Sequence, residues 1–320
     1  MAAPRGPIAF GKYRLIEQLG RGGMAEVWRA LAEGPGGFAR TVVIKRILRA
    51  HASDSRFVDL FFREARLSAR LHHANVAQVY DFGEVEGDWF LAMEYLDGRD
   101  LGALLREAAP LAPGLAAFIV RDLCRALGYV HAATDDDGAL LGLVHRDVSL
   151  SNVMVCFDGA VKLLDFGVAK ALGALGGVFT SPGTLVGKPS YMAPEQIEGR
   201  TVDHRADLYA AGVVLYEASA GERLFRAGMD LTAATRERER LLPLPSEANA
   251  RVPAAIDRVF RRATAWDPAD RYAVAAEMIA ELDEVVHAER AGTEAIAALM
   301  RDVFKRDAPS PPPTVPQRTP

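Results

Sequence analysis

The chain has 320 residues, 50% of them apolar, and is long enough to bury one large core or two smaller ones. Its 38 Lys and Arg nearly balance 42 Asp and Glu, and a formal net charge of -4 argues against binding to nucleic acid or to an anionic membrane surface. Two isolated cysteines without metal-ligand spacing argue against a zinc or disulfide framework. No apolar run reaches the about 18 residues that a membrane helix needs, and the start lacks the apolar core of a signal peptide. We therefore expect a cytoplasmic chain.

The first third of the chain alternates short apolar segments with glycine-rich turns, a pattern typical of an antiparallel sheet. The expected strands are YRLIEQL (13–19), EVWRAL (26–31), RTVVIKRI (40–47), VAQVYDFGEV (76–85) and DWFLAMEYL (88–96).

A helix is expected between the third and fourth of these strands. Leu60, Glu64, Leu67 and Leu71 recur there at helical spacing, which places a carboxylate within an apolar stripe. Burying that carboxylate is costly unless a cation meets it. Lys45, on the preceding strand, is the candidate partner of Glu64, although a solvent-facing lysine would fit the strand equally well.

From about residue 98 the pattern becomes helical, over 101–108, 115–133, 207–220 and the segments beyond 252. A last helix at 296–304 has Ile296, Leu299, Met300 and Val303 on one face, and we expect it to pack on the helical part of the chain. The proline-rich end predicts an extended tail or linker. The expected parts are a β-rich domain at 10–97, an α-rich domain at 98–304 that includes the additional helix, and the tail at 305–320.

LGRGGMAEV (19–27) is the first candidate for phosphate binding, because glycines let backbone N–H groups approach phosphate oxygens. An ordinary turn would have the same composition. A dinucleotide-binding fold would place a helix directly after the loop, whereas a strand is expected here.

Two later segments, HRDVSLSN (145–152) and LLDFGVAK (163–170), carry the side chains that phosphoryl transfer requires. Asp147 can accept the proton of an incoming hydroxyl, and Asn152 and Asp165 can supply hard oxygen ligands for Mg²⁺. Taken singly, these three residues would also fit ordinary turns.

The glycine loop, Lys45, Glu64, HRDVSLSN, DFG and YMAPEQ (191–196), in this order, resemble the motifs of eukaryotic-like (Hanks-type) bacterial serine/threonine protein kinases. The resemblance covers about residues 10–285. It implies an α+β, two-lobed protein kinase fold, with a small antiparallel β N-lobe and a larger, mainly helical C-lobe. It also implies transfer of the γ-phosphoryl group of ATP, with Mg²⁺, to serine or threonine hydroxyls of proteins. Ala25 departs from the family's pattern at the third glycine.

The resemblance further implies a set of nucleotide-binding residues. Val43 and Met154 would contact adenine, Met93 would be the gatekeeper, Glu94 and Leu96 would offer backbone groups, Asp100 would lie near the ribose, Lys45 would meet the phosphates, and the loop would contribute Leu19, Gly20, Gly22, Gly23 and Val27. Two structural roles are implied as well. Glu195 would pair with Arg271, and Asp207 would brace the catalytic loop from a buried helix.

Ser149 departs from the family, which usually has a lysine two residues after the catalytic aspartate. The family's G-T-x-x-Y segment reads GKPSY here, so Lys188 stands where a threonine is usual. We predict that the two groups have exchanged places and that Lys188 and Ser149 both serve catalysis; a mere surface charge at Lys188 is the alternative. Ser149 and Ala25 also support a nucleotide-binding pseudokinase scaffold. A tyrosine-specific kinase is a third interpretation, although the arginine typical of that group is absent from VSLSN.

The segment between DFG and YMAPEQ predicts regulation. Thr180, Ser181 and Thr184 are available hydroxyls, of which Thr184 is the preferred site of phosphorylation. Arg146 is a natural receiver for the added negative charge. Phosphorylation of one copy by another would require a transient homodimer.

Overall fold

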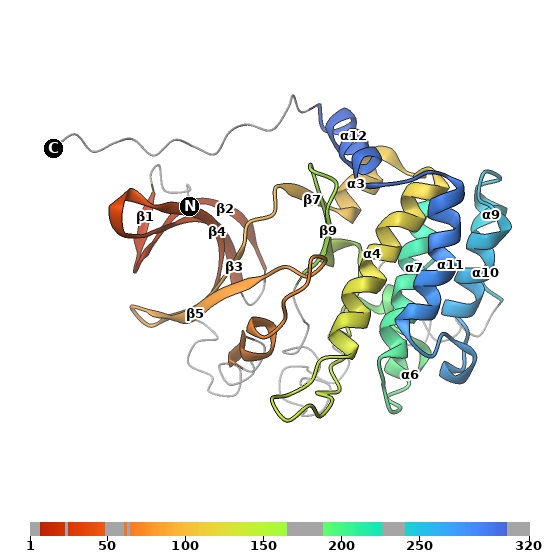
Figure 1. Cartoon of the computed structure of the whole chain (residues 1–320), viewed down its shortest axis with the longest axis horizontal. Coiled ribbons are helices and arrows are strands. Elements are labelled where there is room, and N and C mark those ends of the chain that lie inside the picture. The colour runs from red at the N-terminus through yellow and green to blue at the C-terminus, as the bar shows by residue number, and fades with distance from the viewer. Residues whose placement is uncertain are drawn as a thin grey trace. The chain divides into compact units, whose positions relative to one another are not determined.

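The computed structural model describes residues 7–22, 25–48, 61–62, 65–164, 188–225 and 241–305. The chain divides into two compact units (Figure 1). The first contains the chain up to His72 together with Ala77–Leu96, and the second contains His73–Val76 and the chain from Asp97 to Asp307.

The first unit contains one antiparallel sheet of six strands in the order β1-β2-β3-β4-β6-β5. The strands are β1 Ile8–Phe10, β2 Tyr13–Arg21, β3 Ala25–Glu33, β4 Ala39–Ile47, β5 Val79–Val85 and β6 Asp88–Glu94. All five predicted strands are confirmed. β1 is an additional strand that pairs with β2, where Phe10 lies opposite Tyr13.

One face of this sheet is a hydrophobic core. Burial alternates along the middle of β3, where Glu26, Trp28 and Ala30 are buried, and of β4, where Val42 and Ile44 are buried, as the two-residue period of a strand requires. The core cluster consists of Phe10, Tyr13, Leu15, Trp28, Ala30, Val42, Ile44, Phe90 and Ala92. Phe90 meets the rings of Phe10 and Tyr13 edge-on, at centroid distances of 5.5 and 5.3 Å. The alternate side chains of the same strands therefore point to the opposite face.

The second unit is mainly helical. Its helices are α3 Leu101–Ala108, α4 Pro113–His131, α6 Pro194–Ile197, α7 Arg205–Ala220, α9 Pro245–Ala248, α10 Ala254–Ala263, α11 Ala275–Ala288 and α12 Thr293–Val303. Three short strands, β7 Gly98–Asp100, β8 Val153–Cys156 and β9 Val161–Leu163, form a separate sheet. The predicted helices at 101–108, 115–133 and 207–220 are confirmed.

α7 forms the centre of the helical unit, and all its residues from Ala206 to Ala220 are buried. α4 and α10 pack against it, and Figure 1 shows α4, α7, α11 and α10 side by side. Gly212 permits the close approach of α10, since a Cβ there would lie 2.8 Å from the Cβ of Ala263. A helix buried all round is mostly apolar on every side, which explains why α7 lacks a continuous polar face; its few polar side chains, such as Asp207 and Glu217, are buried as well.

α12 packs on α3 and β8, with Ile296 and Met300 fully buried. The expectation that this helix packs on the helical part of the chain is confirmed. Phe304, just beyond α12, meets Phe157 edge-on at 6.1 Å.

Part of the predicted helix between β4 and β5 is described, and residues 61–62 and 65–69 of it are helical. Glu64 lies outside the described residues, and so does the tail beyond residue 305. Within the described residues, no helix has the length and apolar character needed to cross a bilayer.

A buried ion pair joins α6 to the segment before α11. Arg271 donates to both carboxylate oxygens of Glu195, at 2.7 and 2.8 Å, and also to the carbonyls of Ala265 and Trp266. The two side chains are 0% and 1% exposed. The predicted pairing is confirmed, and all three guanidinium nitrogens donate hydrogen bonds, as a buried charge requires.

Glu195→Gln is expected to lower the free energy of unfolding by about 3–5 kcal/mol, because it leaves the Arg271 guanidinium buried without a counter-charge. Glu277→Gln is the matched control. It removes one of the two acidic partners of Arg262, in a pair whose side chains are 42% and 38% exposed, and should cost no more than about 1 kcal/mol. Urea unfolding of both variants measures the difference, and equal, small losses would contradict the expectation.

Candidate active site

The HRDVSLSN segment is held by a carboxylate from α7. The two oxygens of Asp207 accept the backbone N–H groups of His145 and Arg146, both at 2.8 Å, and the Nε2 of His131 lies 2.8 Å from one of them. Burial raises the pKa of Asp207, but these hydrogen bonds and the nearby imidazoles outweigh burial and leave its pKa below the ordinary value. The predicted brace is confirmed.

Arg146 occupies a strained backbone conformation, with φ of 61°. A residue with a side chain pays about 1 kcal/mol or more for this left-handed region and stays there only when its surroundings impose it. The hydrogen bond from its N–H to Asp207 supplies that constraint. The loop therefore turns between His145 and Asp147 in a manner that depends on α7.

His145 connects the catalytic loop to the strand that precedes DFG. Its ring is fully buried, its Nδ1 accepts the N–H of Asp147 at 3.3 Å, and its Nε2 lies 2.9 Å from the carbonyl oxygen of Leu164. Because Nδ1 accepts a hydrogen bond, Nε2 carries the proton and donates it to Leu164. Asp165, the next residue, lies outside the described part of the chain.

Asn152 is joined directly to Asp147. Its Nδ2 donates to the Asp147 carbonyl at 2.8 Å and to the Asp147 carboxylate at 2.7 Å. Since the amide nitrogen has two acceptors, the amide oxygen points away from Asp147, where it accepts a hydrogen bond from the Ser151 hydroxyl at 3.3 Å. An amide oxygen is a hard ligand atom of the kind that Mg²⁺ prefers.

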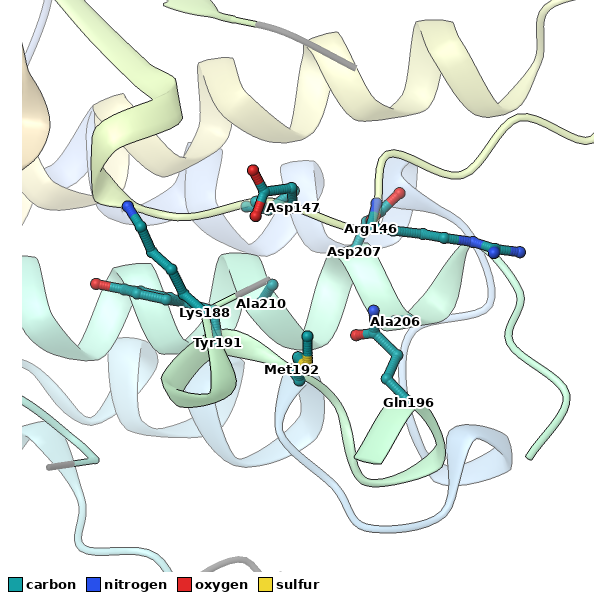
Figure 2. A pocket seen from close by; sticks show the side chains of 10 residues that line it. Arg146, Asp147, Lys188, Tyr191, Met192, Gln196, Ala206, Asp207 and Ala210 are labelled. Carbon is teal, nitrogen blue, oxygen red and sulfur yellow. The ribbon is translucent and has the colours of Figure 1, made fainter. Parts of the chain in front are cut away.

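The Lys188 side chain extends from the segment just before YMAPEQ (191–196) to the HRDVSLSN segment (145–152), the catalytic loop. Its Nζ lies 3.5 Å from the Ser149 hydroxyl, at the outer limit of a hydrogen bond, and it contacts the Ser151 hydroxyl more closely. In Figure 2, Asp147 lies between the Lys188 amine and the Arg146 guanidinium, which extend in opposite directions. The structure thus brings Lys188 and Ser149 together.

Ser151 and the Tyr191–Glu217 contact are parts of this region that the sequence did not single out. The Tyr191 hydroxyl donates to Glu217 at 2.7 Å. Burial raises the pKa of Glu217, although the hydrogen bond from Tyr191 and the positive charge of Arg223 oppose the rise. Spacing in the sequence carries no signal for such a contact, because the two residues come from different elements.

In the first unit, several expected nucleotide contacts share the face of the sheet opposite its core. Val27 lies opposite Lys45, and Val43 lies opposite Met93, in the register of β3, β4 and β6. On the other side of β3, Val27 is paired with Gly20 of β2. All four side chains are half-buried, so they are neither packed in the core nor fully exposed.

The remaining expected nucleotide contacts fall at the ends of strands. The N–H of Glu94, at the end of β6, already donates to the Gln78 carbonyl at 2.8 Å. Leu96 is half-buried, and Leu19 is 47% exposed. In the second unit, Asp100 lies opposite Met154 in the β7–β8 pair, and its carboxylate caps α3 by accepting the Ala103 N–H at 2.9 Å.

Several expected site residues lie outside the described part of the chain. They are Gly23, Glu64, Asp165, Thr180, Ser181 and Thr184.

Residues 13–306 match the family model of the protein kinase domain. The chain is 39% identical over 303 residues to tyrosine-protein kinase MasK of Myxococcus xanthus, covering 92% of this chain and 46% of that protein. It is also 39% identical to serine/threonine-protein kinase PknB of Mycolicibacterium smegmatis, over 86% of this chain and 43% of that protein. The chain therefore spans somewhat less than half the length of these curated relatives.

A solved structure of the PknI kinase domain from M. tuberculosis has the same fold. It aligns with a TM-score of 0.66 and 30% sequence identity, covering 89% of this chain and 100% of that domain. The family uses ATP with Mg²⁺. This chain belongs to the protein kinase family, in its eukaryotic-like (Hanks-type) bacterial branch.

Proposed function

We propose that the chain is an active serine/threonine protein kinase, which transfers the γ-phosphoryl group of ATP to hydroxyls of protein substrates. The observation that carries the proposal is the joined geometry of Asp147 and Asn152 on one braced loop, with the Lys188 ammonium 3.5 Å from Ser149 of the same loop. Dependence on ATP suits the cytoplasm, where we place the activity. We assign residues 10–97 to the N-lobe and 98–304 to the C-lobe.

Asp147 is the group that receives the proton of the substrate hydroxyl. It is 8% exposed, and Asn152 holds one of its oxygens, so its carboxylate has a set orientation. Bound ATP with Mg²⁺ supplies the phosphoryl group and neutralises its charge. Asn152 and Asp165 are the proposed ligands of the metal.

Lys188 supplies the positive charge that the family normally takes from the position of Ser149. Its ammonium lies within 3.5 Å of that hydroxyl, so the charge is delivered to the same region from another segment. Preorganised charge near a transferring phosphoryl group is among the largest contributions to its stabilisation. Ser149 is fully buried, and its hydroxyl takes the place of the threonine hydroxyl that the family usually has at position 188.

The nucleotide is assigned to the residues that the resemblance implied. In the first unit, Lys45 meets the phosphates, and we pair it with Glu64. Val27, Val43 and Met93 share the face of the sheet away from its core, which supports a role in contacting the nucleotide. Leu19, Gly20, Gly22 and Gly23 belong to the loop, and Glu94 and Leu96 offer backbone groups. Asp100 and Met154, adjacent on β7 and β8, complete the set.

Serine and threonine are the preferred acceptors over tyrosine. PknB is named a serine/threonine kinase, whereas MasK is named a tyrosine kinase, so similarity alone supports both. The absence of an arginine from VSLSN favours the first.

Regulation is proposed at Thr184, with Thr180 and Ser181 as further sites, by transfer between two copies in a transient homodimer. Arg146 supports this assignment, because its guanidinium forms no ion pair with any residue that the structure describes. A phosphate group would offer it a strong partner.

Asp147→Asn is expected to reduce phosphate transfer by about 10²–10⁴-fold, as loss of a general base typically does, while ATP binding persists. Labelled ATP with a generic protein acceptor measures transfer, and acid hydrolysis of the product identifies the labelled amino acid. Equal labelling by wild type and variant would favour a pseudokinase, and labelled tyrosine alone would refute the serine/threonine assignment.

Lys188→Thr alone should lower the rate by about 10²–10³-fold, the typical cost of removing one preorganised stabilising group. Adding Ser149→Lys should recover part of the loss, with a coupling of about 0.5–3 kcal/mol between the two positions. A double-mutant cycle on the initial rate tests this pair. Additive losses, or a harmless Lys188→Thr, would show that the ammonium does not replace the family's lysine.

Active protein is expected to carry phosphate on Thr184, Thr180 or Ser181, and Arg146→Ala should remove most of the activation that follows phosphorylation. Mass spectrometry before and after incubation with ATP locates the modification, and the rate of the first minutes reports activation. An unmodified segment in fully active protein would rule out this mode of regulation.

A further inference from the structure

A cavity of about 320 Å³ opens beside the catalytic loop, in the second unit. Its wall combines Ser151 of the loop, the Lys188 side chain, α3, and the end of α7 with the residues that follow it. The volume lies at the lower end of the about 300–1,000 Å³ typical of ligand pockets. Lys188 and Tyr191 line both this cavity and the smaller space of about 10 Å³ beside Asp147, so the two are adjacent.

The cavity carries three exposed cationic side chains, Lys188, Arg106 and Arg223. Within the described part of the chain, neither arginine forms a salt bridge or a side-chain hydrogen bond. The Arg106 side chain lies along its own helix, α3, and its Nη1 is 3.7 Å from the place that a Cβ on Gly102 would occupy. Two guanidinium groups that form no hydrogen bond with the described residues therefore flank the same hollow.

The three carboxylates of the cavity wall are already engaged. Asp100 caps α3, Glu222 accepts the Tyr216 hydroxyl at 3.0 Å, and Glu217 accepts the Tyr191 hydroxyl at 2.7 Å. Glu217 is also only 3% exposed, and its second oxygen is buried. Among the charged residues that line the cavity, the three exposed cationic side chains outnumber the one exposed carboxylate, Glu222.

We propose that this cavity is a substrate subsite for an anionic side chain, an aspartate, a glutamate or a phosphorylated residue, close to the serine or threonine that receives phosphate. The guanidinium fork binds carboxylate and phosphate oxygens through two parallel hydrogen bonds, which gives specificity as well as attraction. The inference rests on the proposed kinase function, because it assigns the occupant to the protein substrate.

The binding test uses peptides in which alanine replaces the acceptor, so that it does not depend on turnover. One series carries a single aspartate, glutamate or phosphoserine at each position around the acceptor, and a matched series carries lysine or arginine. Fluorescence anisotropy should show about five- to tenfold tighter binding of an anionic peptide at one or two positions, weakened by added salt. Glutamate against phosphoserine at that position distinguishes a carboxylate subsite from a phosphate subsite.

Arg106→Gln and Arg223→Gln should each reduce the preference about two- to fivefold, and the double charge reversal to glutamate should favour the basic series. Arg258→Glu is the control, because Arg258 is an exposed arginine of α10 that does not line the cavity. Equal binding of both series, tighter binding of the basic series by wild type, or a preference that survives both arginine substitutions would overturn the subsite.

Serine-containing versions of the same peptides, with labelled ATP, report phosphate transfer in parallel. Transfer without an anionic preference refutes the subsite and leaves the kinase function standing. Anionic preference in binding without transfer supports the subsite and refutes the kinase function.

Discussion

Asp207 is the group on which the active-site arrangement depends. A carboxylate that is 1% exposed would be strongly disfavoured in a helical core, yet here it accepts two backbone N–H groups and faces an imidazole. Those bonds compensate the cost of burial and, at the same time, hold Arg146 in a backbone conformation that it would not adopt alone. The centre of the helical unit and the catalytic loop are therefore stabilised together.

From that anchor, a short chain of hydrogen bonds sets the positions of the chemical groups. His145 binds the Asp147 backbone on one side and the Leu164 carbonyl on the other, and Asn152 closes the loop onto Asp147. Each bond orients a neighbour that the next bond uses, so the loop has little freedom once α7 is in place. This rigidity is what transition-state stabilisation by fixed charges requires.

In the proposed mechanism, Lys188 meets from a different part of the chain a requirement that the family usually meets on the catalytic loop. A positive charge beside the transferred phosphoryl group is needed, but the side chain that carries it need not belong to the catalytic loop. With serine at position 149 there is space for an ammonium to enter from another segment, and the contacts with Ser149 and Ser151 are those of such a side chain. The cations around the neighbouring cavity extend the same positive region toward the protein substrate.

The sequence by itself determined the strands and the main helices and indicated the candidate catalytic groups, because these depend on local periodicity and on motifs of fixed spacing. The alternation in β3 and β4 even separates the core face from the face that carries Lys45. Only the tertiary structure decided that the Lys188 ammonium lies within reach of Ser149, that Glu217 is covered by Tyr191, and that Arg106 and Arg223 flank one cavity. Contacts between residues far apart in the chain depend on how helices and loops pack, and side-chain spacing along the chain carries no record of that packing.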